Sequence, residues 1–408
     1  MDWRSEPRSR DEELAFRLRV RSPPQAVQRT PADTPDTRIG ALGTQSVWLR
    51  IAPFMVSSGN FRGAFYTAAM KPQAAIAAES HSASAGVVSS PARLLALLAD
   101  GTEVSGSALA LELGVTRAAV WKQIEQLRSF GLSIDAVAGR GYRLEAPVEL
   151  LDVARITAAI DPTQSAAVGE IDVRWQIDST SSELLRRAGT APRACLAEIQ
   201  TRGRGRRRRA WQTPLGGAIA LSFLRRFDGG MAALSGLSLV AGIAVIRALA
   251  DCGVEEPQLK WPNDVVARGR KLAGILVELA GDALGPCQAV VGVGLNLRMN
   301  ETHAQAIDQP WIDLSILTGG AHLSRNQLAG RILSRLAEAL ALFAREGFAA
   351  FGEDYARRDA LSGRRITVSG NGEAWNGIAQ GVTARGALKV SRGDRDIEID
   401  SAEVSVRG

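Results

Sequence analysis

The stretch LKWPNDVVARGRKLAGILVELAG, residues 259–281, has a polar turn followed by a long apolar run. This stretch is the strongest indication of the fold in the middle of the chain. Lys260 and Asp264 flank its Trp-Pro-Asn turn, and Lys271 stands at the start of a run typical of a buried strand. Charged groups gathered around one strand favour a ligand site on a folded domain. The stretch therefore predicts a strand of a mixed domain with a polar site at its beginning.

The sequence on both sides of this stretch predicts an α/β or α+β domain, because apolar strand-like runs alternate with helical patterns from about residue 150 onward. Strands are expected at 171–177, 194–200, 217–224, 257–260, 272–280 and 287–294. Helices are expected at 152–160, 181–188, 232–250 and 324–346. The last part, 361–407, contains short β-rich runs between Gly and Asp turns, which predicts a small closed barrel of about five or six strands.

An arginine-rich loop, TRGRGRRRRAW at residues 201–211, follows one of the predicted strands and places six arginines in the eight positions 202–209. Gly203 and Gly205 let the backbone approach a ligand closely or adopt positive φ. Guanidinium groups fit phosphate oxygens, but arginine-rich segments bind RNA or DNA at least as often. The position of the loop after a strand, upstream of Lys-Trp-Pro-Asn-Asp, favours a polyphosphate clamp.

Residues 91–143 predict a winged helix-turn-helix. An amphipathic helix is followed by two more helices. A break at Gly114 separates these two, and Thr116 is the N-cap of the third helix. Two short strands around a glycine turn then form the wing. The second helix of this motif lies in the major groove of DNA, although a small helical domain that merely packs is the alternative. The residues expected to contact DNA are Arg117, Lys122 and Gln126 on the helix and Arg140 and Arg143 on the wing.

The composition fits a folded protein with anionic partners, since the 408 residues carry a formal net charge of +6 and 46% of them are hydrophobic. Three distant cysteines show no C-x-x-C pair and no metal-ligand spacing to the three histidines, which predicts reduced thiols in the cytoplasm and no metal held by the protein alone. The apolar run nearest to a membrane helix, 235–250, is too short and contains Arg247, so no membrane contact is expected.

Residues 1–88 differ from the rest of the chain, because they mix Arg, Ser, Pro, Gln, Thr and Ala without sustained periodicity. The segment RSPPQAVQRTPADTPDT resists any regular element. The region is therefore predicted to be a disordered or mis-started extension.

Two further stretches complete a recognisable set of motifs. QIDSTSSEL, residues 176–184, places hydroxyl groups at a strand-to-helix turn, where they cap the helix or bind a small polar ligand. VVGVGLNL, residues 290–297, ends a strand with two glycines and Asn296. With the arginine-rich loop and Lys-Trp-Pro-Asn-Asp, these stretches resemble biotin protein ligases. With the winged helix in front, residues 91–408 resemble the bifunctional class that is both biotin ligase and biotin-operon repressor.

The resemblance implies an α+β protein of three domains. These are a winged helix-turn-helix at 89–148, a biotin/lipoate-ligase-like mixed α/β catalytic domain at 149–358 and an SH3-like small β-barrel at 359–408. It also implies a two-step reaction, in which biotin and ATP with Mg²⁺ form biotinyl-5′-adenylate and a lysine of a biotin carboxyl carrier protein of acetyl-CoA carboxylase then takes the biotinyl group. Further implied partners are operator DNA and a second copy of the chain, in a homodimer that the adenylate promotes.

The same resemblance assigns roles to individual residues. Lys271 and Arg206 are implied as catalytic. The implied biotin-binding residues are Ser179, Thr180, Ser181, Gln200, Arg204, Gly205, Arg206, Lys271 and Gly274. The implied nucleotide-binding residues are Arg206, Trp211, Lys260, Asp264, Asn296 and Trp311. Mg²⁺ is expected to enter with ATP, and Asp264 is the carboxylate placed to help hold it.

Two positions depart from the pattern of the family. Arg208 stands where the arginine-rich loop usually has glycine, and Ser181 stands where the biotin-binding turn commonly has asparagine. Two other functions compete with the ligase. A regulator that only senses a small ligand has no need of Lys271 and Arg206, and an arginine-rich RNA-binding protein gives no reason for Lys-Trp-Pro-Asn-Asp.

Overall fold

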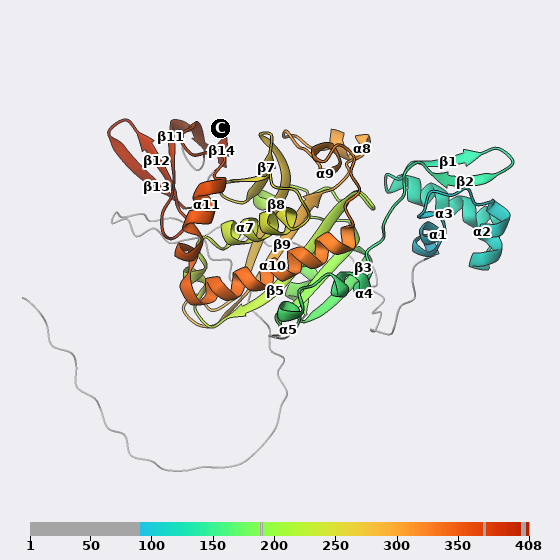
Figure 1. Ribbon diagram of the computed structural model, residues 1–408, viewed down its shortest axis with the longest axis horizontal. Coiled ribbons are helices and arrows are strands. Elements are labelled where there is room, and N and C mark those ends of the chain that lie inside the picture. Colours follow the sequence, from blue (N-terminus) through green and yellow to red (C-terminus); the bar gives the residue numbers. More distant parts are fainter. Residues whose placement is uncertain (1–89, 188, 190, 370–372, 401–404, 408) are drawn as a thin grey trace, which may run out of the picture. The chain divides into compact units, whose positions relative to one another are not determined.

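The computed structural model describes residues 90–187, 189, 191–369, 373–400 and 405–407 (Figure 1). The prediction for residues 1–88 lies outside this part of the chain. None of the helices in the described ranges is both long enough and apolar enough to span a bilayer.

The first described elements confirm a helix-turn-helix with a wing. They are α1 (Ser90–Leu98), α2 (Gly106–Leu113), α3 (Arg117–Ser129), β1 (Ile134–Val137) and β2 (Gly141–Leu144). Gly114 has φ +66° at the turn between α2 and α3, and the Thr116 hydroxyl accepts a hydrogen bond from the Ala119 N–H at 3.1 Å. One face of α3 is fully buried through Val120, Ile124 and Leu127, as the spacing predicts.

A seven-stranded sheet in the order β3-β4-β5-β9-β8-β7-β6 forms the central domain. Its strands are β3 (Glu170–Ile177), β4 (Arg193–Gln200), β5 (Ala218–Phe227), β6 (Gln258–Lys260), β7 (Asp264–Ala267), β8 (Arg270–Gly281) and β9 (Cys287–Asn296). The β3–β4 pair is parallel and the other pairs are antiparallel. All six predicted strands are confirmed. The sequence did not predict β7, because this strand of four residues follows the Trp-Pro-Asn turn directly.

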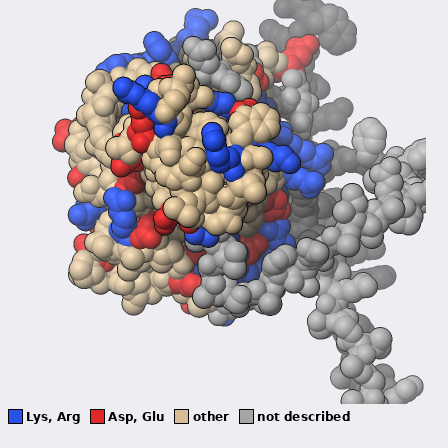
Figure 2. Space-filling model, turned by 90° about the vertical axis from the view of Figure 1, so that its right-hand side faces the viewer, with Lys and Arg blue, Asp and Glu red and all other residues tan. Residues whose placement is uncertain are grey.

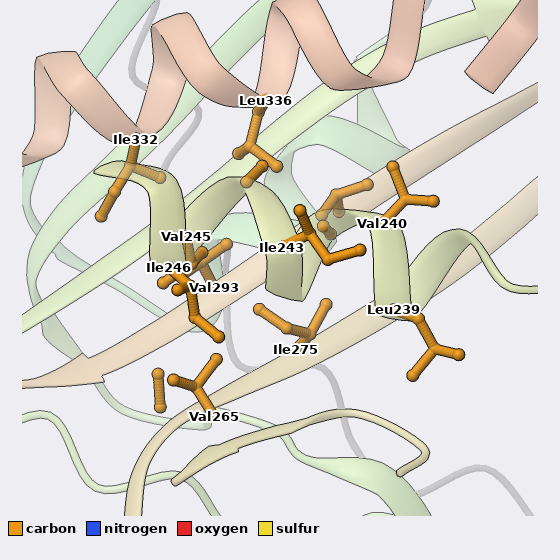
Figure 3. Close-up of a cluster of buried hydrophobic side chains, with 14 of the residues drawn as sticks. Leu239, Val240, Ile243, Val245, Ile246, Val265, Ile275, Val293, Ile332 and Leu336 are labelled. Carbon is orange, nitrogen blue, oxygen red and sulfur yellow. The ribbon is translucent and has the colours of Figure 1, made fainter. Parts of the chain in front are cut away.

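Two long helices, α7 (Leu237–Ala250) and α10 (Arg325–Glu346), cover one face of this sheet (Figure 1). Figure 3 shows α7 between α10 and the strands, with Ile332 and Leu336 on one side and Val293 and Ile275 on the other. Because α7 is enclosed on both sides, nearly all of its side chains are buried. The predicted helix 232–250 is divided in the structure, since Gly236 has φ +82° and separates η3 (Met231–Leu234) from α7.

Shorter helices fill the connections of the central domain. They are α4 (Val153–Ala158), η1 (Pro162–Gln164), α5 (Ser165–Val168), α6 (Thr180–Arg186), η2 (Arg206–Arg208), α8 (Glu301–Gln305), α9 (Leu314–Leu317), η4 (Phe348–Phe351) and α11 (Gly352–Arg358). Among these, α4 and α6 were predicted from the sequence, as was α10.

A five-stranded antiparallel sheet in the order β13-β12-β11-β10-β14 follows at the C-terminal end. Its strands are β10 (Arg365–Ser369), β11 (Trp375–Val382), β12 (Leu388–Arg392), β13 (Arg395–Ile399) and β14 (Ser405–Arg407). This confirms a small β-domain. Within the described residues β13 and β14 are edge strands, so closure into an SH3-like barrel stays a prediction.

A buried ion pair lies beneath the segment that leads from the wing into the central domain. The Arg325 guanidinium at the start of α10 donates to a Glu198 carboxylate oxygen of β4 at 2.9 Å, and both side chains are 4% exposed. The other Glu198 oxygen accepts from the Leu151 N–H at 2.6 Å. Arg325 also donates to the carbonyl oxygens of Glu149 and Ala218. These bonds fix the entering chain to both the sheet and the helix.

Candidate active site

A cavity of about 480 Å³ opens at one end of the central sheet, a size typical of small-molecule sites. Its walls are the start of α6, the arginine-rich loop, the turn before β7, the strands β8 and β9, and the segment 306–311, which we name the lid. Thirteen of the residues predicted to bind biotin or nucleotide line it: Thr180, Ser181, Gln200, Arg204, Gly205, Arg206, Trp211, Lys260, Asp264, Lys271, Gly274, Asn296 and Trp311. The structure therefore brings together side chains that the sequence spreads over more than a hundred positions.

One predicted residue, Ser179, does not line the cavity. It is 3% exposed, and its hydroxyl group accepts from the Ser182 N–H at 3.4 Å as the N-cap of α6. The structure thus gives Ser179 the capping role that the sequence left open. Its effect on the cavity is indirect, because it fixes the turn that presents Thr180 and Ser181.

Hydrogen-bonding groups form one end of the cavity. The Gln200 side-chain amide oxygen accepts from the Thr180 N–H at 3.0 Å, and the Thr180 and Ser181 hydroxyls lie 2.7 and 2.9 Å from the Ser222 hydroxyl. Ser222 is fully buried and was missed by the sequence analysis, although a single serine within the apolar run of β5 was visible. The short Ser181 side chain, where the family commonly has asparagine, is satisfied here by Ser222.

Glycines form the floor of the cavity beneath Trp211. A Cβ atom at Gly294 would lie 2.2 Å from the indole ring, so no larger residue fits while the ring stays in place. At Gly274 the nearest atoms to such a Cβ would be those of Lys271 and Trp211, at 3.1 Å. The Trp211 Nε1–H is buried and has no hydrogen-bond partner among the described residues, so it is a donor available to a ligand.

A lysine and a carboxylate form the charged centre of the cavity. The Lys271 ammonium lies 2.7 Å from an Asp264 carboxylate oxygen and 5.6 Å from the centre of the Trp211 ring. The Lys271 backbone is held in place, since its N–H donates to the Pro310 carbonyl and its own carbonyl accepts from the Ile312 N–H. The ammonium is therefore a fixed positive charge beside the lid.

Asn296 supports this arrangement from below. It is 3% exposed, and its side-chain amide donates to the Ile312 carbonyl at 3.1 Å and to the Lys271 carbonyl at 3.4 Å. These bonds join the end of β9 to the start of β8 and to the end of the lid. The geometry thus makes Asn296 a residue that positions Lys271.

The arginine-rich loop folds back on itself beside the cavity. The Trp211 N–H donates to the Gly203 carbonyl at 2.9 Å, and a Cβ atom at Gly203 would lie 2.6 Å from the Trp211 carbonyl, so glycine is required there. Arg204 forms an ion pair with Glu278 of β8 at 3.0 Å. Burial, with the neighbouring charge of Arg207, lowers the pKa of Arg206, yet a guanidinium stays protonated at neutral pH. The loop therefore brings a half-buried positive charge into the cavity.

Positive φ occurs in this loop at arginines rather than at its glycines. Arg207 has φ +55° and Arg208 has φ +61°, a region that costs an L-residue with a side chain about 1–2 kcal/mol. Arg208 stands where the family usually has glycine. Glycine adopts such a φ without strain, which agrees with the glycine that the family resemblance leads us to expect at this position.

For biotinyl-5′-adenylate, the ligand that the resemblance implies, Arg208→Gly is expected to slow dissociation by about fivefold, because it removes about 1 kcal/mol of backbone strain from the folded loop. The measurement is the release of radiolabelled adenylate. Arg208→Ala is the matched control, since it removes the same charge but keeps the Cβ atom. Equal dissociation rates for the glycine and alanine variants would contradict the strain argument.

Carboxylates are few in this cavity. Among the described residues that line it, only Asp264 and Asp308 carry one, and the described ranges contain no cluster of three His, Cys, Asp or Glu that could hold a metal ion. Mg²⁺ is commonly bound by one or two carboxylates together with substrate phosphates. The donor set therefore fits a magnesium ion that arrives with a nucleotide.

The predicted DNA-contacting residues lie apart from the cavity, on the winged helix. Arg117, Lys122 and Gln126 are exposed on α3. On the wing, Arg140 lies 3.3 Å from Glu103, and Arg143 lies 3.3 Å from Asp135. The wing arginines are thus partly compensated by neighbouring acids.

Comparisons with known proteins agree with each of these parts. A model of the biotin/lipoate A/B protein ligase family matches residues 169–296, an HTH domain model matches 92–143, and a model of the biotin protein ligase C terminal domain matches 361–407. These three matches fall on the central sheet, the winged helix and the C-terminal sheet.

Similar sequences and structures cover most of the described chain. The chain is 40% identical over 300 residues to the bifunctional ligase/repressor BirA of Salmonella typhimurium, which covers 73% of this chain and 91% of that protein. It is 35% identical to the biotin–[acetyl-CoA-carboxylase] ligase of Mycobacterium tuberculosis, over 58% of this chain and 88% of that one. The biotin protein ligase of Aquifex aeolicus, solved with biotin and ATP, aligns with a TM-score of 0.51 and 28% identity over 59% of this chain and 99% of that one.

Proposed function

This chain belongs to the biotin protein ligase family, and we propose that it is an ATP-dependent biotin protein ligase that also acts as a biotin-responsive DNA-binding repressor. One observation carries the enzymatic part of the proposal. A single cavity joins the hydrogen-bonding end at Thr180, Ser181 and Gln200 to the cations Arg206 and Lys271. Such a cavity suits a small molecule with a polar ring at one end and a carboxylate at the other.

In the first step a biotin carboxylate oxygen attacks the α-phosphorus of ATP, and the bond to the β-phosphate breaks to release pyrophosphate. Both reactants are anions, so fixed positive groups must offset their repulsion. We assign this role to Lys271 and Arg206. Lys260 and Trp311 line the same cavity and are proposed to bind the nucleotide, with the lid 306–311 closing over adenine.

In the second step a lysine amine of the acceptor attacks the acyl carbon of biotinyl-5′-adenylate, and AMP leaves. The amine must first lose a proton. Asp264 and the oxygens of the adenylate are the bases within reach, and in the ligand-free structure Asp264 is paired with Lys271. We propose a biotin carboxyl carrier protein of acetyl-CoA carboxylase as the acceptor. Mg²⁺ would enter as the counter-ion of ATP, and Asp264 is the cavity carboxylate that would help to hold it.

A homodimer joined through sheet edges is proposed for the repressor. Within the described residues, β8 pairs with β7 only over 270–274, whereas its residues 277–281 have a strand partner on one side alone, β9. An unpaired strand edge can take up a second copy of the chain. The Arg204–Glu278 ion pair connects the arginine-rich loop to this edge. Binding of the adenylate under the loop is thereby proposed to act on the strand edge that forms the dimer contact.

A second contact supports coupling between the adenylate site and DNA. The Asn300 amide, at the start of α8, donates to the carbonyl of Gly131 just after α3 at 2.7 Å. Since α8 leads into the lid 306–311, ordering of the lid over adenine acts on the end of the DNA-binding helix. We propose that occupancy by the adenylate thereby strengthens DNA binding.

A cytoplasmic location is proposed as well. Cys195, Cys252 and Cys287 are all free thiols, as is usual in a reducing compartment. Burial raises the pKa of the Cys195 thiol to about 12, so this thiol is unreactive at neutral pH.

The enzymatic proposal is tested with purified protein, biotin, ATP with Mg²⁺ and an isolated acceptor domain. We expect a biotinylated lysine by mass spectrometry and an adenylate when the acceptor is left out. If biotin binds but neither product forms, the chain is a sensor and the ligase proposal is wrong. For the repressor, biotin and ATP together should tighten binding to duplexes that the protein selects from a random library. DNA affinity that is the same with and without biotin and ATP would contradict the proposal that the adenylate controls DNA binding.

A further inference from the structure

An exposed tryptophan on α3 has no role in the functions described so far. Trp121 is 54% exposed, whereas each other tryptophan in the described ranges is buried or half-buried. It lies one turn after Arg117 and next to Lys122, beside the buried stripe that Val120, Ile124 and Leu127 form on α3. In a helix-turn-helix, the first turns of this helix contact the base edges in the major groove.

The charge of the surrounding domain indicates how such a helix is held on DNA. Residues 90–148 contain six Lys or Arg and six Asp or Glu, so the winged helix carries no net charge. On the face shown in Figure 2, Lys and Arg are interspersed with Asp and Glu around a broad uncharged area. Phosphate attraction, which supplies binding irrespective of sequence, is therefore weak here, and contacts with base edges must contribute more.

An indole in the major groove has one apolar partner on base edges, the 5-methyl group of thymine. Arg117 and Lys122 flank Trp121 and complement the phosphates on either side of such a contact. Gln126, five residues after Trp121 on the same helix, is also exposed and can pair with an adenine edge. The exposed surface of α3 therefore combines cations, an amide and one large apolar group.

We propose that Trp121 reads DNA sequence by placing its indole against the methyl group of a thymine. This inference rests on the DNA-binding part of the proposed function and goes further by naming a residue that determines specificity. It commits this surface of α3 to DNA rather than to a second copy of the chain.

The test uses the full chain with biotin, ATP and Mg²⁺, and duplexes that the wild-type protein selects from a random library. Affinity is measured by fluorescence anisotropy at one salt concentration for wild type, Trp121→Ala and Trp121→Phe. Each thymine of the selected duplex is also replaced singly by uracil, which removes only the methyl group. Leu111→Ala is the matched control, since Leu111 is 86% exposed on α2 of the same domain.

Trp121→Ala should weaken binding to the selected duplex by roughly tenfold and leave binding to unrelated duplexes unchanged. Trp121→Phe should retain most of the affinity, and Leu111→Ala all of it. Uracil at one position should weaken the wild type but not Trp121→Ala. Equal uracil effects in both proteins, or equal losses on selected and unrelated duplexes, would overturn the proposal. A Trp121→Ala variant that fails to dimerise by sedimentation would also overturn it and assign the surface to a second copy. A wild type that binds no duplex would reject DNA binding itself.

Discussion

Replacing Lys271 by alanine should lower the rate of biotinyl-adenylate formation by about a hundred- to a thousandfold, the usual cost of removing one fixed group that stabilises developing charge. Two features of the structure predict a large effect. The Lys271 side chain is 17% exposed, so water cannot easily replace its ammonium, and the Lys271 backbone is hydrogen-bonded to Pro310 in the lid and to Ile312 just after it. The variant also leaves the Asp264 carboxylate without its cation beside an incoming triphosphate.

The uncompensated Asp264 carboxylate of Lys271→Ala can be tested with further variants. Asp264→Asn alone removes the partner of Lys271, and the double variant Lys271→Ala/Asp264→Asn removes the uncompensated carboxylate as well. If charge is the reason for the loss, the double variant should recover part of the activity of Lys271→Ala, and the two effects should not add. Lys271→Arg keeps the charge but changes its shape, so an intermediate rate is expected.

The two half-reactions separate the role of Lys271 from a general loss of structure. Adenylate formation is followed by biotin-dependent exchange of pyrophosphate into ATP, and transfer is followed from chemically prepared biotinyl-adenylate to an acceptor domain. We expect the first step to fall far more than the second. Unchanged exchange in Lys271→Ala would remove this residue from the catalytic site.

Periodicity and turn residues were sufficient to predict most of the fold. The α3 face and the break at Gly114 followed from spacing and from one glycine, and all six predicted strands were found. The spacing of apolar side chains along a helix or strand shows which face of that element is buried, so neighbouring residues are sufficient to predict it. The four-residue strand β7 and the division at Gly236 were missed, because each depends on a turn whose conformation the spacing does not reveal.

The candidate site was predictable to the extent that its residues stand in recognisable motifs. Lys271, Asp264 and Arg206 were placed from the motifs and do line one cavity. Ser222 was not, because a serine in an apolar strand acquires meaning only when α6 brings Thr180 and Ser181 against it. Contacts between distant segments depend on tertiary packing, which no local pattern records.

The buried Glu198–Arg325 pair is the clearest case of such a contact, since 127 positions separate the two residues. Arg325→Ala should lower the free energy of unfolding of the central domain by about 3–5 kcal/mol, because it leaves the Glu198 carboxylate buried without a cation. The loss should appear as a lower urea midpoint of the transition followed by fluorescence. Binding of adenylate should protect the variant, as any ligand of the folded state does.

Two comparison variants distinguish an uncompensated charge from a simple loss of contacts. Arg325→Met/Glu198→Gln replaces the pair by uncharged groups and keeps an acceptor for the Leu151 N–H, so most of the stability should return. Arg268→Ala breaks the exposed pair with Glu256, at 51% and 44% exposure, and should cost at most about 1 kcal/mol. If the double variant is no more stable than Arg325→Ala, the loss comes from the hydrogen bonds of Arg325 to the Glu149 and Ala218 carbonyls instead. The stability of the junction would then depend on those backbone contacts and not on the charge of Glu198.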